Sequence, residues 1–426
     1  MRRASFTRRP GPLAAALALL AAGWAVTFLL GPFNDESVTD LPLYSAYGDL
    51  FLGGKLPYRD VAFEYPPLAA PVIAVGGLAG DVDSYRVAFA AVTFLFAAAL
   101  VWLCGELARA SGGDRTRAML AAGAAPLLCG AMIRTHFDLV PVVLTVAALA
   151  LLCAGRPRGG LAVLGVAVAV KLYPLVVLPV AVVWLVSRGQ RRAAVEGTAA
   201  LAVVVLVVYG VALALSPAGT RGSLAYHAKR PVQVESAPAV ALRALDALGA
   251  GQATPDGSHR SDGLDHPASG LVTALFAALM AGTIALLALA AGQRRGGDPP
   301  GPRALVLGGL GATVAFAAFG KVLSPQFLIW VVPLLALAVA WRTPGLTAAS
   351  ALAIVLTLIE FPGHYDAVVD RAPAALALVA ARDATMIVVV GLSLQAMGAK
   401  RPAVPAPGSA RSWWRGRPRR PRPAPR

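Results

Sequence analysis

Apolar runs long enough to cross a lipid bilayer recur along this chain of 426 residues, and they constrain its fold more than any other feature. A transmembrane helix needs about 20 mostly apolar residues. Hydrophobic residues make up 57% of the chain and charged residues only 14%, whereas about a quarter of a soluble domain is charged. The chain is therefore predicted to be an all-α polytopic membrane protein.

Arginine clusters, Pro/Gly pairs or polar loops separate these runs and predict twelve membrane-spanning helices. The predicted spans are residues 12–31, 84–108, 116–133, 138–155, 159–172, 174–188, 193–215, 269–292, 303–320, 326–341, 345–361 and 378–398. A shorter apolar helix at 68–79 is predicted to be re-entrant or interfacial, because counting it as a span would place the arginines after residue 108 outside.

The net charge of +16 is unevenly distributed, since most Lys and Arg residues fall on one predicted side of the membrane and most acids on the other. This positive-inside pattern predicts a multi-pass plasma-membrane protein with both termini cytoplasmic. The first span is predicted to be an uncleaved anchor, because its apolar run is longer than that of a typical signal peptide.

Three regions follow from this topology. Residues 1–11 form a basic cytoplasmic N-terminus, and residues 12–398 form the transmembrane domain with two long outer loops, 32–83 and 216–268. Residues 399–426 combine Arg, Pro and Trp and cannot form a core, so we expect a disordered cytoplasmic tail. Such a tail is attracted to anionic membrane lipids, and no nucleic-acid partner is predicted.

The first outer loop is rich in acidic and tyrosine residues. Asp40, Tyr44, Tyr47 and Phe51 have the spacing of one face of a short interfacial helix. Asp40 could cap this helix, since Asp is a common N-cap residue, or it could supply a functional carboxylate. The sequence EYPP at 64–67 then begins the apolar helix at 68–79.

The second outer loop contains HAKRPVQVES at 227–236, followed by a stretch rich in Gly, Asp and His at 251–268. The glycines and serines between the histidines favour a flexible linker over a metal site. The three cysteines lie in apolar stretches at no metal-ligand spacing, so no metal site is predicted.

Four shorter polar clusters lie at predicted outer helix ends, at 134–138, 171–174, 321–326 and 360–366. A single lysine in such a place often only extends to the interface. Four clusters facing one acidic loop instead indicate an outward-facing site with a carboxylate and several cations.

These residue types suit transfer of a sugar from a lipid phosphate to a hydroxyl group. A carboxylate can take the proton of the acceptor oxygen, and Arg, Lys or His can stabilise the departing phosphate. A nucleotide-sugar donor would instead require an inner Rossmann-like domain, for which the inner loops are too short. Two other hypotheses remain, a transporter or flippase of lipid-linked sugars and a non-catalytic membrane scaffold. A transporter would carry ionisable groups near the bilayer midplane.

Several motifs resemble the actinobacterial glycosyltransferase family 87, also called the DUF2029 family, whose members are GT-C-fold membrane enzymes. The specific part is GKLPYRD at 54–60 followed by EYPP at 64–67, and the weaker elements are Asp40 before Tyr44, KLYP at 171–174, RPVQVES at 230–236 and SPQF at 324–327. The resemblance spans about residues 12–398.

This resemblance implies a polyprenyl-phosphate sugar donor carrying mannose or arabinofuranose, and a glycolipid or cell-wall polysaccharide acceptor. The lipid-linked sugar is a substrate, so no cofactor is expected, and the requirement for a divalent metal stays open. The family base is an Asp ahead of a Tyr in the first outer loop, which corresponds to Asp40, with Asp35 as the competitor. The predicted substrate-binding residues are Tyr44, Tyr58, Asp60, Glu64, Tyr65, Arg134, His136, Lys171, Arg230, Gln233, Glu235, Lys321, Gln326 and His364.

Overall fold

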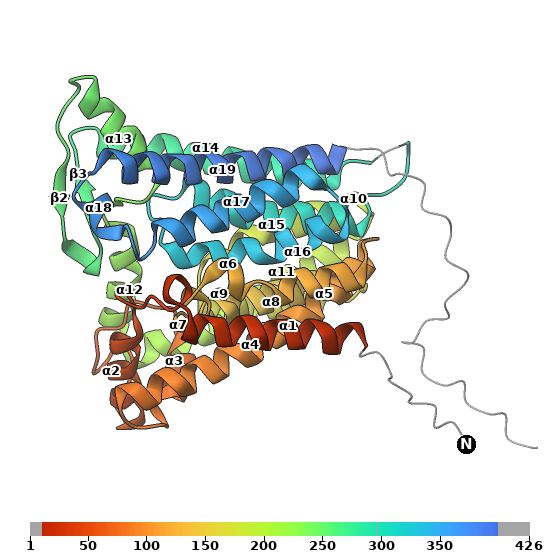
Figure 1. Ribbon diagram of the computed structural model, residues 1–426. Coiled ribbons are helices and arrows are strands. Elements are labelled where there is room, and N and C mark those ends of the chain that lie inside the picture. Colours follow the sequence, from red (N-terminus) through yellow and green to blue (C-terminus); the bar gives the residue numbers. More distant parts are fainter. Residues whose placement is uncertain (1–10, 295, 399–426) are drawn as a thin grey trace, which may run out of the picture.

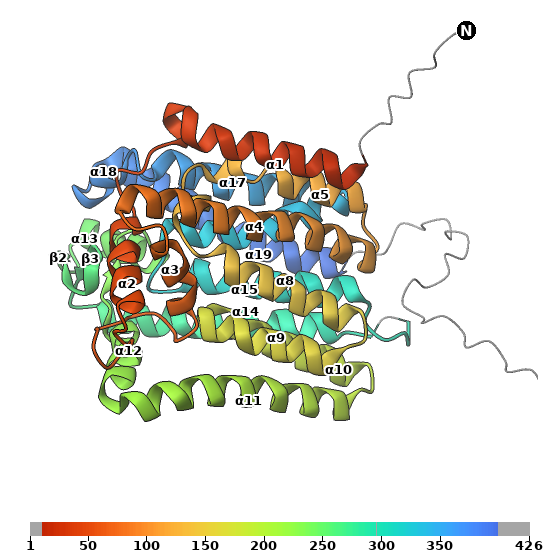
Figure 2. The same cartoon turned by 90° about the horizontal axis from the view of Figure 1, so that it is seen from below.

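The computed structural model describes residues 11–294 and 296–398. Long helices run side by side in one direction and form a bundle (Figure 1; Figure 2). The predictions for residues 1–10 and for the tail 399–426 lie outside the described residues. The all-α polytopic architecture predicted from the apolar runs is confirmed for the described part.

Within the described residues, six helices are long and apolar enough to cross a membrane. They are α1 (Pro12–Leu29), α4 (Val82–Ala110), α11 (Arg191–Leu215), α14 (Ser269–Gly292), α15 (Pro302–Phe319) and α19 (Pro373–Gly398). Shorter apolar helices account for five more predicted spans: α8 (Leu139–Cys153), α9 (Pro157–Val170), η2 with α10 (Tyr173–Val176 and Val177–Ser187), η4 with α16 (Pro325–Val331 and Val332–Ala340) and α17 (Pro344–Glu360).

The predicted continuous span at 116–133 is wrong. The chain there forms three short helices, α5 (Arg115–Gly123), α6 (Pro126–Cys129) and α7 (Met132–Thr135). Pro126 has no amide hydrogen to continue the first helix, and Gly130 adopts a positive φ of 57° that ends the second. This interruption lets residues 136–138 turn into the end of the bundle before α8 begins.

One end of the bundle carries the elements that do not span (Figure 1). These are η1 (Gly31–Phe33), α2 (Leu41–Leu52), α3 (Ala69–Gly77), α12 (Pro217–Lys229), α13 (Ala237–Ala247), η3 (Ser258–Arg260), α18 (Tyr365–Val369) and three short strands, β1 (Val232–Gln233), β2 (Thr254–Asp256) and β3 (Gly263–Asp265). The strands form an antiparallel sheet in the order β1-β3-β2. The start of α1 and the end of α19 lie at the opposite end of the bundle.

The first outer loop folds as its tyrosine spacing predicts. Tyr44 and Tyr47 lie buried on one face of α2 in an aromatic cluster that also contains Phe63 and Phe89. The nine-residue helix α3 packs on α2 and is too short to span a bilayer, which agrees with the prediction that 68–79 is re-entrant or interfacial and not a span.

The prediction of a flexible linker at 251–268 is also wrong. This stretch forms β2, η3 and β3, and β3 pairs with β1 from the preceding segment. Within it the His266 side chain is buried, with Nε2 3.2 Å from Oδ1 of Asp246. β3 also pairs with β2 within the stretch, whereas its other partner, β1, lies outside it, so the composition of the stretch does not contain the whole sheet.

Burial distinguishes the outer helices from the central one. Of the 18 most apolar consecutive residues in each helix, only 11% are buried in α11 and 17% in α14. In α15, 72% are buried. Figure 2 shows α11 at the edge of the bundle. The apolar exposed faces of α11 and α14 are therefore suited to lipid, with α15 in the interior.

Candidate active site

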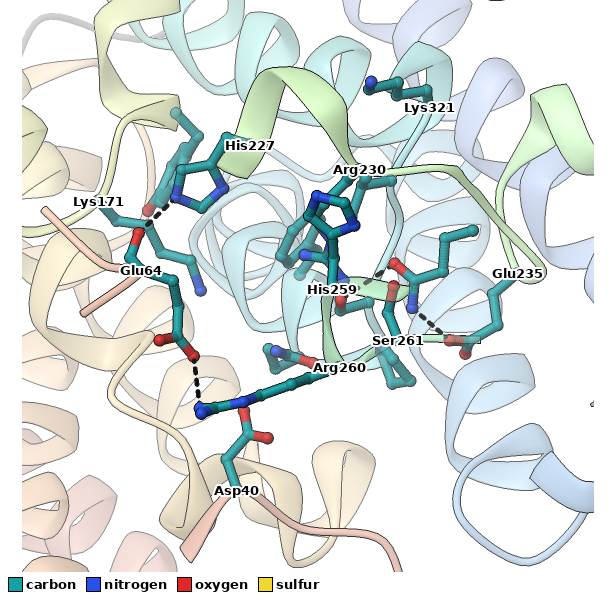
Figure 3. Close-up of a pocket in the computed structure, with 18 of the residues that line it drawn as sticks. Asp40, Glu64, Lys171, His227, Arg230, Glu235, His259, Arg260, Ser261 and Lys321 are labelled. Atoms are coloured by element: carbon teal, nitrogen blue, oxygen red, sulfur yellow. Dashed lines mark hydrogen bonds and ion pairs between the residues drawn. The ribbon is translucent and has the colours of Figure 1, made fainter. Parts of the chain in front are cut away.

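A cavity of about 790 Å³ opens at the end of the bundle that carries α2 and α12. Each of the four predicted polar clusters supplies residues to its lining, as does the first outer loop. Figure 3 shows Lys171 and Lys321 from two of the clusters and Asp40 and Glu64 from the loop. Ten of the predicted site residues line it: Asp40, Glu64, Tyr65, His136, Lys171, Arg230, Gln233, Glu235, Lys321 and Gln326.

Asp40 directly precedes α2, but its side chain does not cap the helix. The amide of Leu41 donates instead to Oγ1 of Thr39, at 3.3 Å. The Tyr44 hydroxyl donates to Oδ2 of Asp40 at 3.2 Å, and Nε2 of His136 lies 3.8 Å from the same oxygen. Burial raises the pKa of Tyr44, so its phenol remains a donor. The Asp40 side chain therefore does not act as a helix cap, and Asp40 lines the cavity.

Glu64 is a second carboxylate in the cavity. It accepts a hydrogen bond from Tyr47, and Nη1 of Arg260 lies 3.6 Å from its Oε1 (Figure 3). Its backbone carbonyl accepts a hydrogen bond from Nε2 of His227 at 2.7 Å. Burial lowers the pKa of His227, so a neutral imidazole makes this bond at neutral pH. The EYPP motif is therefore tied to the second outer loop at the cavity wall.

Lys171 is held by a buried carboxylate, with Nζ 2.7 Å from Oδ1 of Asp138. The same oxygen accepts a hydrogen bond from the Trp330 indole at 2.7 Å. The Lys171 ammonium also lies 4.9 Å from the centre of the Phe137 ring. Only 15% of the Lys171 side chain is exposed. Lys171 is therefore not a lysine that merely extends from a helix end to the membrane interface.

Arg230 and Lys321 supply positive charge that no carboxylate neutralises. Within residues 11–294 and 296–398, neither side chain forms an ion pair, and the Arg230 guanidinium makes no hydrogen bond. Nζ of Lys321 donates to the carbonyl of Ala228 at 2.8 Å. Burial and the nearby Arg230 lower the pKa of Lys321. A pair of cations of this kind is suited to bind a phosphate.

The cavity continues between two membrane-spanning helices as an apolar corridor. Thr273, Ala277 and Met280 line it from α14, and Phe316 and Phe319 line it from α15. The three α14 residues have the spacing of one helix face and extend over about 10 Å of helix length. The cavity therefore joins a charged end to an apolar one.

Arg134 was predicted to contact the donor phosphate, and the structure places it elsewhere. Its guanidinium is buried, pairs with Glu36, donates to the carbonyl of Thr27 at 2.7 Å and lies over the Phe28 ring. It also donates to Asn34 at 2.7 Å. Arg134 thus anchors the end of α1 to the first outer loop and does not line the cavity.

Four other predicted residues also lie outside the cavity lining. Asp60 is paired with the neighbouring Arg59 on the surface, and Tyr58 donates to the Tyr65 carbonyl at 2.6 Å. His364 is exposed, with Nδ1 2.8 Å from the carbonyl oxygen of Ile359. Tyr44 supports Asp40 from the buried side. The competing base, Asp35, accepts hydrogen bonds from Ser37 and does not line the cavity.

The sequence analysis missed cavity residues from the 251–268 stretch, above all His259, Arg260 and Ser261. Arg260 reaches Glu64 and the Tyr47 hydroxyl, at 3.6 Å and 3.1 Å. The lone arginine between Gly, Ser and His residues was the available signal. In the part of the chain that the structure describes, no group of three His, Cys, Asp or Glu side chains could hold a metal ion.

A family described as alpha-(1→6)-mannopyranosyltransferase, N-terminal domain, matches residues 44–188, about a third of the chain. The matched segment contains Glu64, His136 and Lys171, and it begins four residues after Asp40. No curated protein matches the chain. The crystal structure of ArnT from Cupriavidus metallidurans in the apo state aligns over 90% of this chain and 76% of that one, with 17% identity and a TM-score of 0.39.

The ArnT alignment is too loose to transfer any residue, and the resemblance to glycosyltransferase family 87 is not confirmed by these matches. The mannosyltransferase match covers the first outer loop from residue 44 onward and the helices from α3 to α10. Together with the apolar helices, it supports a membrane glycosyltransferase.

Proposed function

We propose that this chain transfers a mannosyl or arabinofuranosyl unit from a polyprenyl-phosphate donor to a glycolipid or cell-wall polysaccharide on the outer face of the plasma membrane. The observation that carries the proposal is the composition of one cavity. It combines the Asp40 carboxylate, the unpaired cations Arg230 and Lys321, and an apolar corridor between α14 and α15.

In the proposed reaction, one group of cavity residues serves the acceptor hydroxyl and another serves the departing phosphate. The acceptor hydroxyl attacks the anomeric carbon and forms the new glycosidic bond, while the bond from that carbon to the phosphate oxygen breaks. Asp40 takes the hydroxyl proton as general base, with Tyr44 and His136 fixing its orientation. The bond electrons leave with the polyprenyl phosphate, whose charge Arg230 and Lys321 stabilise.

The apolar corridor supports a lipid-linked donor over a soluble one. A polyprenyl chain attached to a phosphate near Arg230 would continue between Ala277 on α14 and Phe319 on α15. A nucleotide would instead require polar partners there. No resident cofactor forms part of this proposal.

The proposed sidedness follows from the arrangement of the bundle. The cavity lies at the end opposite to the start of α1 and the end of α19 (Figure 1). If these helix ends face the cytoplasm, as the distribution of Lys and Arg predicts, the cavity faces outward.

The test uses membranes that contain the full chain, incubated with labelled polyprenyl-phosphate-mannose or polyprenyl-phosphate-arabinose and a lipid extract. We expect sugar transfer to lipid or polysaccharide from one of the two donors. Membranes with equal amounts of the Asp40→Asn variant are the control. Absence of transfer from both donors, with well-folded protein present, would reject the proposed function.

A further inference from the structure

Four ionisable side chains lie buried at the cavity wall that carries Gln233, and of these four only Glu235 lines the cavity. Glu235, Glu360 and Arg382 are fully buried, and Asp383 is 3% exposed. They come from the segment after β1, from the end of α17 and from α19. Three carboxyl groups surround one guanidinium, and each carboxyl group has one oxygen without a hydrogen-bond donor. The proposed reaction uses none of the four, so their role needs another explanation.

Arg382 connects these groups directly. Its Nη1 donates to Oε2 of Glu360 at 3.1 Å, and its Nε donates to Oδ1 of Asp383 at 2.9 Å. Its Nη2 donates to the backbone carbonyl of Glu235. A membrane-spanning helix therefore holds the loop that follows β1 through a charge-assisted hydrogen bond.

The Glu235 side chain contacts Gln233, which is part of the cavity wall. Its Oε2 accepts a hydrogen bond from the Gln233 side-chain amide at 3.0 Å (Figure 3). Gln233 in turn accepts a hydrogen bond from Ser324 at 3.3 Å, and its backbone amide donates to the Lys321 carbonyl at 3.0 Å. Arg230 is three residues before Gln233. The two unpaired cations thus lie on segments that meet at Gln233.

We propose that Glu235, fixed by Arg382, is a positioning residue that sets the spacing between Arg230 and Lys321 in an anion-binding site for a lipid-linked phosphate. The identity of this anion rests on the proposed function. Oε2 of Glu235 accepts from Gln233, whereas Oε1 of Glu235 and Oε1 of Glu360 are buried without a hydrogen-bond donor. A proton held between the two carboxyl groups would supply that donor.

The charges around Glu235 explain why it holds a proton. Glu360, Asp383 and Arg382 face it from α17 and α19, and the neutral Tyr365 faces it from α18. Burial raises the pKa of Glu235 well above its ordinary value, and the Glu360 carboxylate raises it further. In this proposal Glu235 holds the proton and shares it with the neighbouring Glu360.

The sign of the resulting pH dependence follows from proton binding. Because the folded protein retains a proton on Glu235 that the unfolded chain loses above about pH 4.3, stability falls as the pH rises above that value. The decline continues until the pH passes the pKa of Glu235 in the folded protein. Glu235→Gln carries a permanent hydrogen in the same place, so this part of the pH dependence should disappear.

The first experiment measures how much polyprenyl phosphate raises the melting temperature of the solubilised full chain. We expect wild type and Glu235→Gln to bind it alike, because glutamine can both accept from Gln233 and donate to Glu360. Glu235→Ala leaves the Gln233 amide unpaired and should bind about tenfold more weakly. Thr357→Ala, a buried change elsewhere on α17, is the matched control and should bind like wild type.

Equal binding by wild type and Glu235→Ala would overturn the positioning role, as would absence of binding by wild type. Binding without any sugar transfer by wild type would reject the proposed transferase but leave the anion site in place. The second experiment compares melting temperatures of wild type and Glu235→Gln from pH 5 to 9. If the melting temperatures of the two proteins change in parallel with pH, Glu235 does not hold the proposed proton. A loss of stability with rising pH that is confined to wild type would support the proposed proton.

Discussion

Nε2 of His136 lies 3.8 Å from Oδ2 of Asp40, although the two residues are separated by almost a hundred positions in the chain. The Tyr44 hydroxyl donates to the same oxygen, and no described residue makes a hydrogen bond to Oδ1. One carboxylate oxygen is thus held by neighbours, and the other is free to receive a proton from an acceptor hydroxyl.

Asp40→Asn should lower kcat by about a hundredfold or more, because the amide keeps the shape but cannot take a proton at neutral pH. Turnover of purified protein with saturating donor measures this. Asp35→Asn, in the same loop but outside the cavity lining, is the matched control and should be near normal. Near-normal turnover of Asp40→Asn would remove Asp40 from the mechanism and make Asp35 the next candidate.

Arg230→Gln should raise the KM for the lipid-linked donor by about tenfold or more, since it removes a charged contact to the phosphate. Lys321→Ala should change the donor KM in the same direction. Lys229→Gln changes the adjacent exposed lysine, which does not line the cavity, and should leave the donor KM unaltered. If both cavity variants show the donor KM of wild type, the phosphate does not bind between these cations.

Ala277→Trp should fill the corridor between α14 and α15 and displace the polyprenyl chain. The indole would occupy space that the proposed lipid needs, so the KM for a long-chain donor should rise about tenfold or more. A donor with a very short prenyl chain should be affected less. Leu279→Trp, on the exposed face of α14, is the matched control. Equal effects of Ala277→Trp on both donors would place the lipid elsewhere.

Helix positions followed from apolar length and tyrosine spacing, because both are local properties of the chain. The spans corresponding to α4, α11 and α14 and the interfacial helix α2 are confirmed. The break within 115–135 depends on a proline and a glycine that membrane-spanning helices often tolerate, so composition alone could not predict it.

Side-chain roles were harder to predict, because they depend on partners distant in sequence. Arg134 and Lys171 both lie in polar clusters at helix ends, yet one pairs with Glu36 behind the site and the other with Asp138 at the cavity. Arg260 lies between β2 and β3, which pair with each other, and β3 also pairs with β1 from the preceding segment. These outcomes are set by tertiary contacts, which spacing along one segment does not contain.

Arg134→Met should destabilise the protein and leave the donor KM unchanged. It removes one partner of a buried ion pair, which costs about 3–5 kcal/mol when the other charge stays in place. Thermal unfolding of solubilised protein measures the loss. Arg109→Met removes an exposed cation paired with Glu106, so its cost should be below about 1 kcal/mol. Equal stability of the two variants would contradict the anchoring role of Arg134.

Cysteine labelling in intact cells tests which side of the membrane the cavity faces. In a background without the native cysteines, His364→Cys should react with a membrane-impermeant reagent. His364 is exposed and directly precedes α18, which lies at the cavity end of the bundle (Figure 1). Arg192→Cys, exposed at the other end, should react only after cells are opened. Positions beside Asp40 and Arg230 should behave like His364, and Arg415, outside the described residues, like Arg192. The reverse pattern would place the cavity in the cytoplasm, where the proposed outer-face acceptors are absent, and would overturn the proposed reaction.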